Sequence, residues 1–170
     1  MKWWRWCLWS IGGAVLLIAL LAGWGALLPL ANTGSRSIDI ARPPAAVWAV
    51  LTDAERAPQW QPMLARVRRL TPTVHEMTYT DGIVARAETT LSDPPRQLVE
   101  RVVPDPAVPF RGGWSTELTP TGTGTRVTFT SSIEIDQPLI RWAQRYIFTM
   151  EKTLDEMLAG LKRETERQSD

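Results

Sequence analysis

The chain has 170 residues, with 19 Lys or Arg against 18 Asp or Glu, so its formal net charge is +1. This length suits one globular domain with a real core. The balanced charge argues against nucleic acid as a partner, because binding to phosphates needs a basic face. The single cysteine, Cys7, can form neither an internal disulfide nor a zinc site.

The N-terminal segment has the composition of a membrane anchor. Residues 8–31 contain no charged side chain, and about 20 apolar residues suffice for a helix to cross a bilayer. Tryptophans, which favour the membrane–water interface, crowd the first residues and recur at Trp24. We therefore predict an uncleaved membrane-spanning helix, with the bilayer contacted through residues 8–31. Residues 1–34 would form the anchor and a short polar linker, and residues 35–170 the globular domain.

A cleaved secretory signal is the alternative to this anchor. The apolar region of such a signal is normally about 7–15 residues long, which is shorter than the present run. Pro29 also lies two residues before Ala31, where a cleavage site needs a small residue. Lys2 and Arg5 precede the apolar run, so the positive-inside rule places the N-terminus in the cytoplasm. We expect the domain on the other side, in the periplasm if the cell is Gram-negative.

The remaining chain predicts strands segregated from helices. Residues 35–41 alternate apolar and polar side chains, as a half-buried strand does. Two prolines then open a short helix that ends near residue 53, and a second helical turn follows it. Six more strands are predicted, at residues 64–73, on either side of the Asp81-Gly82 turn in 75–92, and at 96–104, 110–120 and 124–135.

A single long amphipathic helix is predicted from Pro138 to about Glu166. Its apolar stripe repeats every 3.6 residues and consists of Leu139, Trp142, Tyr146, Met150, Leu154, Met157 or Leu158, and Leu161. The stripe must be buried, and the concave face of the sheet is the surface available for it. The fold class is therefore α+β, and we expect a cavity between the helix and the sheet.

Four segments resemble the SRPBCC superfamily, also called START-like or helix-grip proteins, and within it the polyketide cyclase/dehydrase-like group. They are "IDIARPPAAVWAVLTDAERAPQW", "DPPRQLVERV", "FRGGWSTELTPTGTGTRVTFTSSIEI" and "QPLIRWAQRYIF". The resemblance covers about residues 35–165. It implies a curved antiparallel sheet of about seven strands wrapped around a long C-terminal helix, with an apolar pocket between them. Members of the superfamily bind lipids, sterols, polyketides, quinones and other hydrophobic molecules, and some are enzymes.

The candidate ligand-binding residues are the large apolar side chains and two carboxylates that could line this pocket. They are Trp48, Trp60, Met77, Tyr79, Glu88, Glu100, Trp114, Phe129, Trp142, Tyr146 and Met150. Glu100 and Arg101 are neighbours on one strand, so one of them faces the pocket. Glu88 and Arg86 share a face, and the alternative for them is an outward ladder of ion pairs across strands.

The sequence offers no defensible catalytic constellation. His75 is the only histidine, so a multi-histidine metal site cannot form. It lies next to Glu76 before a predicted strand, and we expect it at the surface. We therefore assign no catalytic residue, no metal site and no cofactor.

Three functions are compatible with these observations. We favour a membrane-anchored protein that binds a hydrophobic small molecule, such as a lipid, a quinone or a polyketide-like compound. The second is a cyclase/dehydratase- or hydrolase-type enzyme that uses a buried Glu/Arg pair. The third is a structural or partner-binding protein whose cavity is filled by side chains. A buried, paired carboxylate on the cavity wall would favour the enzyme, and the absence of a cavity would favour the third function.

Overall fold

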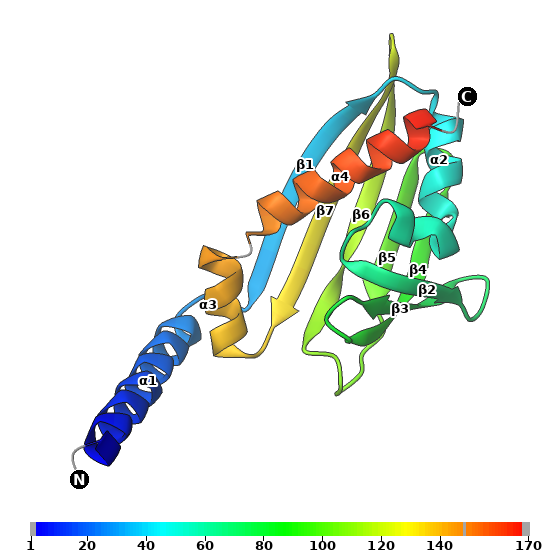
Figure 1. Ribbon diagram of the computed structural model, residues 1–170. Helices are drawn as coiled ribbons and strands as arrows, with labels where there is room; N and C mark the ends of the chain where they lie inside the picture. Colours follow the sequence, from blue (N-terminus) through cyan, green and yellow to red (C-terminus); the bar gives the residue numbers. More distant parts are fainter. Residues whose placement is uncertain (1–2, 148, 168–170) are drawn as a thin grey trace.

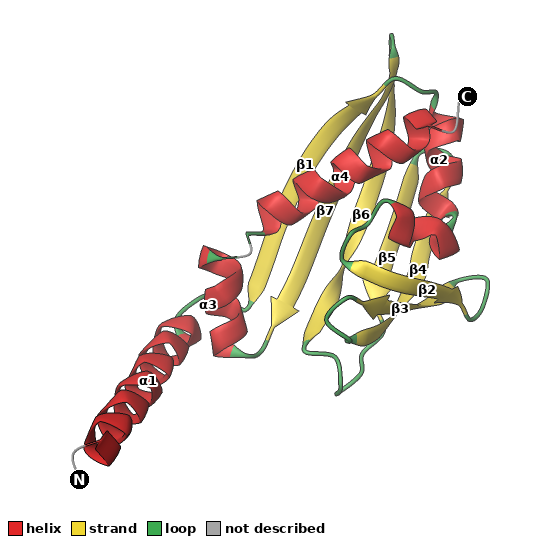
Figure 2. Cartoon of the chain, viewed as in Figure 1, coloured by secondary structure: helices red, strands yellow, loops and turns green. Residues whose placement is uncertain are grey.

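The computed structural model describes residues 3–147 and 149–167. Seven antiparallel strands form one curved sheet in the order β1-β7-β6-β5-β4-β3-β2, and the helices lie on its concave side and at one end (Figures 1 and 2). The strands are β1 (Ala31–Ile40), β2 (Leu64–Arg69), β3 (Val74–Tyr79), β4 (Val84–Asp93), β5 (Gln97–Val102), β6 (Phe110–Thr121) and β7 (Gly124–Ile135). The helices are α1 (Trp3–Ala26), α2 (Pro44–Thr52), the 3₁₀ helix η1 (Ala54–Gln59), α3 (Pro138–Tyr146) and α4 (Met150–Arg167). This arrangement is the predicted α+β helix-grip fold.

The sheet follows the alternation that the sequence predicts. On β7, Val127, Phe129 and Ile135 are buried on the concave face. The Asp81-Gly82 hairpin joins β3 to β4, with Gly82 at φ +90°. One difference concerns residues 31–35, which belong to β1, where Ala31 pairs with Glu134 of β7. The residues predicted to be a polar linker are therefore part of the sheet.

Helix α4 crosses the concave face and buries its apolar stripe there. Leu154, Leu158 and Leu161 are almost inaccessible to solvent. At one end the helix approaches the backbone of the segment after η1 so closely that a Cβ on Gly160 would overlap the carbonyl oxygen of Trp60. Trp60 is itself buried, so this contact holds α4 against the segment between η1 and β2.

The predicted single C-terminal helix is in fact two helices, and this part of the prediction is wrong. α3 ends at Tyr146 and α4 begins at Met150. Met150 lies against Gly34, near the start of β1, and the helical segment before it takes another direction. α3 packs instead on α1, where Trp24 Nε1 donates to Tyr146 Oη at 3.2 Å and Arg141 Nε donates to the Gly25 carbonyl at 3.1 Å.

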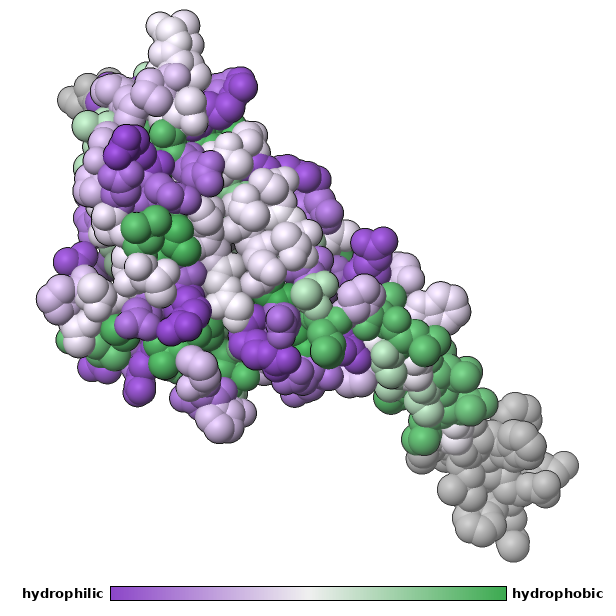
Figure 3. Space-filling model, turned by 180° about the vertical axis from the view of Figure 1, so that it is seen from behind, coloured by the Kyte–Doolittle hydropathy of each residue, from purple (hydrophilic) through white to green (hydrophobic). Residues whose placement is uncertain are grey.

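Helix α1 extends away from the domain and carries exposed apolar side chains. Leu16, Leu17 and Leu20 are each more than half exposed, and Figure 3 shows apolar surface along the described part of this helix. The predicted membrane-spanning helix over residues 8–31 is not confirmed. Across residues 3–147 and 149–167, no helix meets the combined length and apolarity needed to cross a membrane.

Candidate functional site: an apolar cavity with a polar wall

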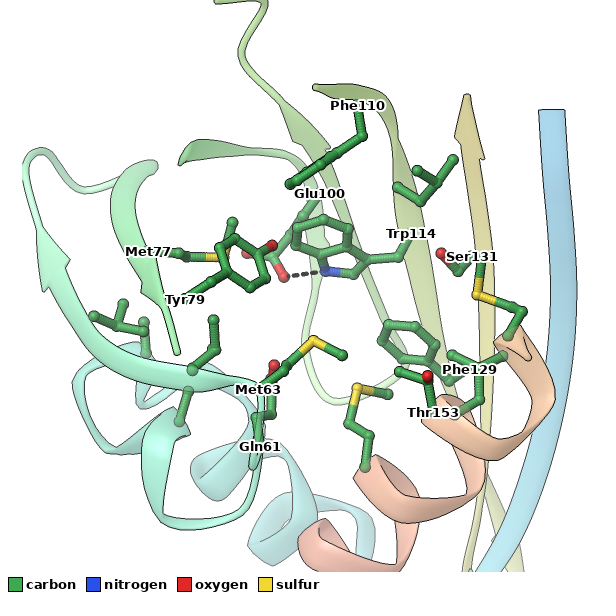
Figure 4. A pocket seen from close by; sticks show the side chains of 18 of the residues that line it. Gln61, Met63, Met77, Tyr79, Glu100, Phe110, Trp114, Phe129, Ser131 and Thr153 are labelled. Carbon is green, nitrogen blue, oxygen red and sulfur yellow. Dashed lines mark hydrogen bonds between the residues drawn. The ribbon is translucent and has the colours of Figure 1, made fainter. Parts of the chain in front are cut away.

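A cavity of about 260 Å³ lies between the concave face of the sheet and α4, close to the lower size limit of ordinary ligand sites, about 300 Å³. The segment from η1 to β2 closes one side of it (Figure 4). Its lining residues are Leu51, Ala54, Ala57, Gln61, Met63, Leu64, Val67, His75, Met77, Tyr79, Glu100, Phe110, Trp114, Phe129, Ser131, Ile133, Gln144, Met150, Thr153, Leu154 and Met157. This cavity argues against the third function, in which side chains fill the interior.

The walls are mostly apolar and adaptable. Four methionines line the cavity, at positions 63, 77, 150 and 157, and methionine side chains repack easily around different ligands. Phe110, Trp114 and Phe129 supply flat aromatic surface from the two long strands β6 and β7. Such a lining favours an apolar molecule held by shape, with few polar contacts.

One wall differs, because Glu100 points into the cavity from β5. Trp114 Nε1 donates to Glu100 Oε2 at 2.8 Å (Figure 4). Glu100 Oε1 lies 3.6 Å from Nε2 of His75 and accepts from Thr89 Oγ1 at 3.5 Å. The side chains of His75 and Glu100 are only 12% and 14% exposed. A carboxylate withdrawn from water in this way must be stabilised by hydrogen bonds or opposite charge, and Trp114 and Thr89 donate hydrogen bonds to it.

Strand alternation explains how these polar groups reach the cavity. Glu100 lies between Leu98 and Val102 on one face of β5, and both of these are buried. His75 shares its face of β3 with Met77 and Tyr79 in the same way, and all three line the cavity. The expectation of a surface His75 is therefore wrong. The signal that places it inside is its two-residue spacing from Met77 and Tyr79, which outweighs the nearby turn.

Tyr79 brings a phenol to the same region. Burial, with a smaller contribution from the charge of Asp81, raises the pKa of Tyr79 to about 12. Its ring meets that of Phe110 edge to face, with centroids 5.8 Å apart. The phenol therefore keeps its proton at neutral pH and can donate or accept a hydrogen bond.

Six of the eleven predicted ligand-binding residues line the cavity: Met77, Tyr79, Glu100, Trp114, Phe129 and Met150. Trp60 belongs to the buried core and Trp48 packs against that core, and neither side chain lines the cavity. Trp142 and Tyr146 lie on α3, where they contact each other beside α1. Ligand contact itself stays a prediction for all eleven.

Glu88 and Arg86 lie on the outer face of the sheet, where they form ion pairs across neighbouring strands, as the alternative interpretation predicted. Glu88 pairs with Arg101 at 3.5 Å and Arg86 with Glu76 at 3.7 Å. The choice between Glu100 and Arg101 is thereby settled, since Glu100 faces the cavity and Arg101 faces solvent. Among the residues that the structure describes, no Glu/Arg pair lines the cavity, and none of them forms a group of three or more His, Cys, Asp or Glu side chains that could hold a metal ion.

The sequence of residues 33–166 matches the family described as polyketide cyclase/dehydrase and lipid transport. The chain belongs to this family. A comparison with curated protein sequences gives no significant match.

Solved structures show the same fold at low identity. A protein from Mesorhizobium loti is 20% identical with a TM-score of 0.63, over 82% of this chain and 99% of that one. A START superfamily protein from Mycobacterium smegmatis is 14% identical with a TM-score of 0.62, over 81% and 99%. One further similar structure is the di-domain aromatase/cyclase StfQ of the steffimycin biosynthetic pathway, which is 17% identical with a TM-score of 0.65. The match covers 82% of this chain and 52% of StfQ.

Proposed function

We propose that the protein binds a hydrophobic small molecule in the cavity between the sheet and α4. The observation that carries the proposal is the cavity itself, which aromatic and methionine side chains line on most sides. Burying an apolar ligand there is favourable by about 25 cal/mol for each Å² of apolar surface removed from water. The family, whose description includes lipid transport, supports the same function.

Native mass spectrometry of the full chain, purified from its own membranes in a mild detergent, tests this proposal. We expect a lipid-like molecule to be released from the protein at a stoichiometry near one. A chain that releases no such molecule, and that also fails to bind a fluorescent fatty probe, would contradict it.

We also propose that α1 attaches the domain to a bilayer, with the domain on the extracytoplasmic side. The exposed leucines of α1 support attachment, and Lys2 and Arg5 support an N-terminus in the cytoplasm. An alkaline phosphatase fusion at the C-terminus should be active. An inactive but well-expressed fusion would place the domain in the cytoplasm, and recovery of the full chain in the soluble fraction would contradict attachment.

The pairing of Glu100 with His75 favours a second candidate function, an enzyme that transfers protons on a hydrophobic substrate. A weak base and a carboxylate on the wall of a largely apolar cavity are suitable groups for general acid–base catalysis. The released molecule distinguishes the two functions. If it is chemically changed on incubation with the protein and unchanged with the Glu100→Gln variant, the protein is an enzyme.

A further inference from the structure

The polar wall has hydrogen-bonding capacity that its own neighbours leave unused. A carboxylate offers about four acceptor positions. Glu100 Oε2 accepts from Trp114 at 2.8 Å, whereas the only hydrogen bond to Oε1 from a residue that the structure describes is the long one from Thr89 at 3.5 Å. The 3.6 Å between Glu100 Oε1 and His75 Nε2 exceeds the usual length of a hydrogen bond. His75 and Glu100 therefore do not use up each other's hydrogen-bonding positions.

His75 and Glu100 lie between the apolar cavity and a second, more polar cleft. The apolar cavity is on one side of His75 and Glu100, and the same two residues line a second, more polar cleft of about 360 Å³ on the other. Thr52, Thr71, Thr73, Thr89 and Ser92 are among the residues that line this cleft. The body of a ligand in the cavity would thus contact mostly apolar side chains, with isolated polar groups such as Ser131 and Thr153, whereas the end of the ligand near Glu100 would meet a buried carboxylate.

Resting on the proposed function, we infer that the ligand is an otherwise apolar molecule with a hydroxyl group at the end that faces His75 and Glu100. A hydroxyl is both a donor and an acceptor. It can donate to a free position on the Glu100 carboxylate, and it can accept a hydrogen bond from His75. A hydrocarbon placed there would leave the carboxylate without its missing donor, which is costly in a buried site. An ether would offer no donor to it.

Matched aromatic probes test this inference on the full chain held in an amphipathic polymer, with protein-free polymer as the partition blank. The probes are 2-naphthol and 2-methoxynaphthalene, which differ in the donor, and binding is followed by their fluorescence. We expect 2-naphthol to bind about tenfold more tightly than its methyl ether, because a hydrogen bond to a charged acceptor contributes that much.

Two variants test whether Glu100 and His75 contact the oxygen atom of the probe. In Glu100→Gln, the preference for 2-naphthol should fall several-fold, while the affinity for the ether stays within about twofold. In His75→Phe, both probes should bind several-fold more weakly, because the oxygen of each probe can accept a hydrogen bond from His75. Glu117→Gln is the matched control, because Glu117 lies on the neighbouring strand β6 and is exposed on its outer face; it should keep the full preference. Circular dichroism confirms that each variant is folded, and if Glu100→Gln does not fold, Glu100→Asp, which withdraws the carboxylate by one methylene group, carries the test with the same expected loss of preference.

The outcomes separate this inference from the proposed function. Equal binding of the two probes to the unaltered protein would overturn the inference and leave the hydrophobic cavity intact as a binding site. A preference that persists in the folded Glu100 variant would overturn it as well, because the hydroxyl would then be recognised elsewhere. If neither probe nor a fluorescent fatty probe binds, the proposed function itself is wrong.

Discussion

The two faces of the sheet use the same residue types for different purposes. On the inner face, Glu100 is 14% exposed and has a histidine, a tryptophan and a threonine around it. On the outer face, Glu88 is 41% exposed and pairs with Arg101, while serines and threonines of β1 and β7 form hydrogen bonds across the strands. The outer carboxylate lies in water and contributes little to stability. The inner one is withdrawn from water and is held by hydrogen bonds from Trp114 and Thr89.

Phe129 and Thr130 provide the largest contrast between the two faces. Phe129→Ala removes an aromatic wall of the cavity that is 8% exposed, and we expect the free energy of unfolding to fall by about 3 kcal/mol. Thr130→Ala removes one hydroxyl contact with Ser35 on the outer face and should cost less than about 1 kcal/mol. Urea denaturation measures both, and equal losses would show that the inner face is not the core.

The close approach of α4 to the backbone of Trp60, on the concave side of the sheet, gives the next effect. In Gly160→Ala the new methyl group overlaps the Trp60 carbonyl, so we expect a loss of about 2 kcal/mol despite the better helix propensity of alanine. Gly122→Ala is the control, because no atom lies within 4 Å of a Cβ at that turn position. A Gly160→Ala variant as stable as the parent would contradict the packing of α4.

Tyr79 reports on the polarity of the cavity through its pKa. The protein has two tyrosines, so the Tyr146→Phe variant leaves Tyr79 as the single phenol. Its absorbance titration should give a pKa of about 12. Because the folded-state pKa lies above the unfolded value of 10, this contribution to stability is complete below pH 10 and is lost as the pH rises towards 12. A titration near pH 10 would mean that Tyr79 is in contact with water.

The smallest effect is expected on the outer face. Glu88→Gln weakens a half-exposed pair with Arg101 and should change the free energy of unfolding by no more than about 0.5 kcal/mol. The same denaturation experiment checks it. A loss above about 2 kcal/mol would mean that the outer face is buried against another molecule.

The alternation of apolar and polar side chains was sufficient to predict most of the fold, because a strand that is buried on one face must have this alternation. The strand β7 was predicted at its exact bounds, and its inward residues Val127, Phe129 and Ser131 are buried. The break between α3 and α4 could not be predicted in this way. The apolar stripe continues through it, and the packing of α3 on α1, which separates the two helices, is a tertiary feature.

The candidate site was harder to predict, since strand alternation gives the face of a residue and not its distance from a cavity. Met77, Tyr79 and Phe129 reach the cavity, whereas Trp60 is equally apolar and lies in the core beside α4. His75 was assigned to the surface because a turn and a charge flank it. Its contact with Glu100 joins β3 to β5, and such a contact depends on the order of strands in the sheet.

The central claim is that the cavity binds a hydrophobic molecule, and filling the cavity tests it most directly. Ser131 lines the cavity and is 6% exposed, whereas its neighbour Ser132 is exposed on the outer face. We predict that Ser131→Phe, which puts a ring into the cavity, abolishes binding of a fluorescent fatty probe by the folded full chain, and that Ser132→Phe leaves it within about twofold of the parent. Undiminished binding by folded Ser131→Phe would contradict the claim.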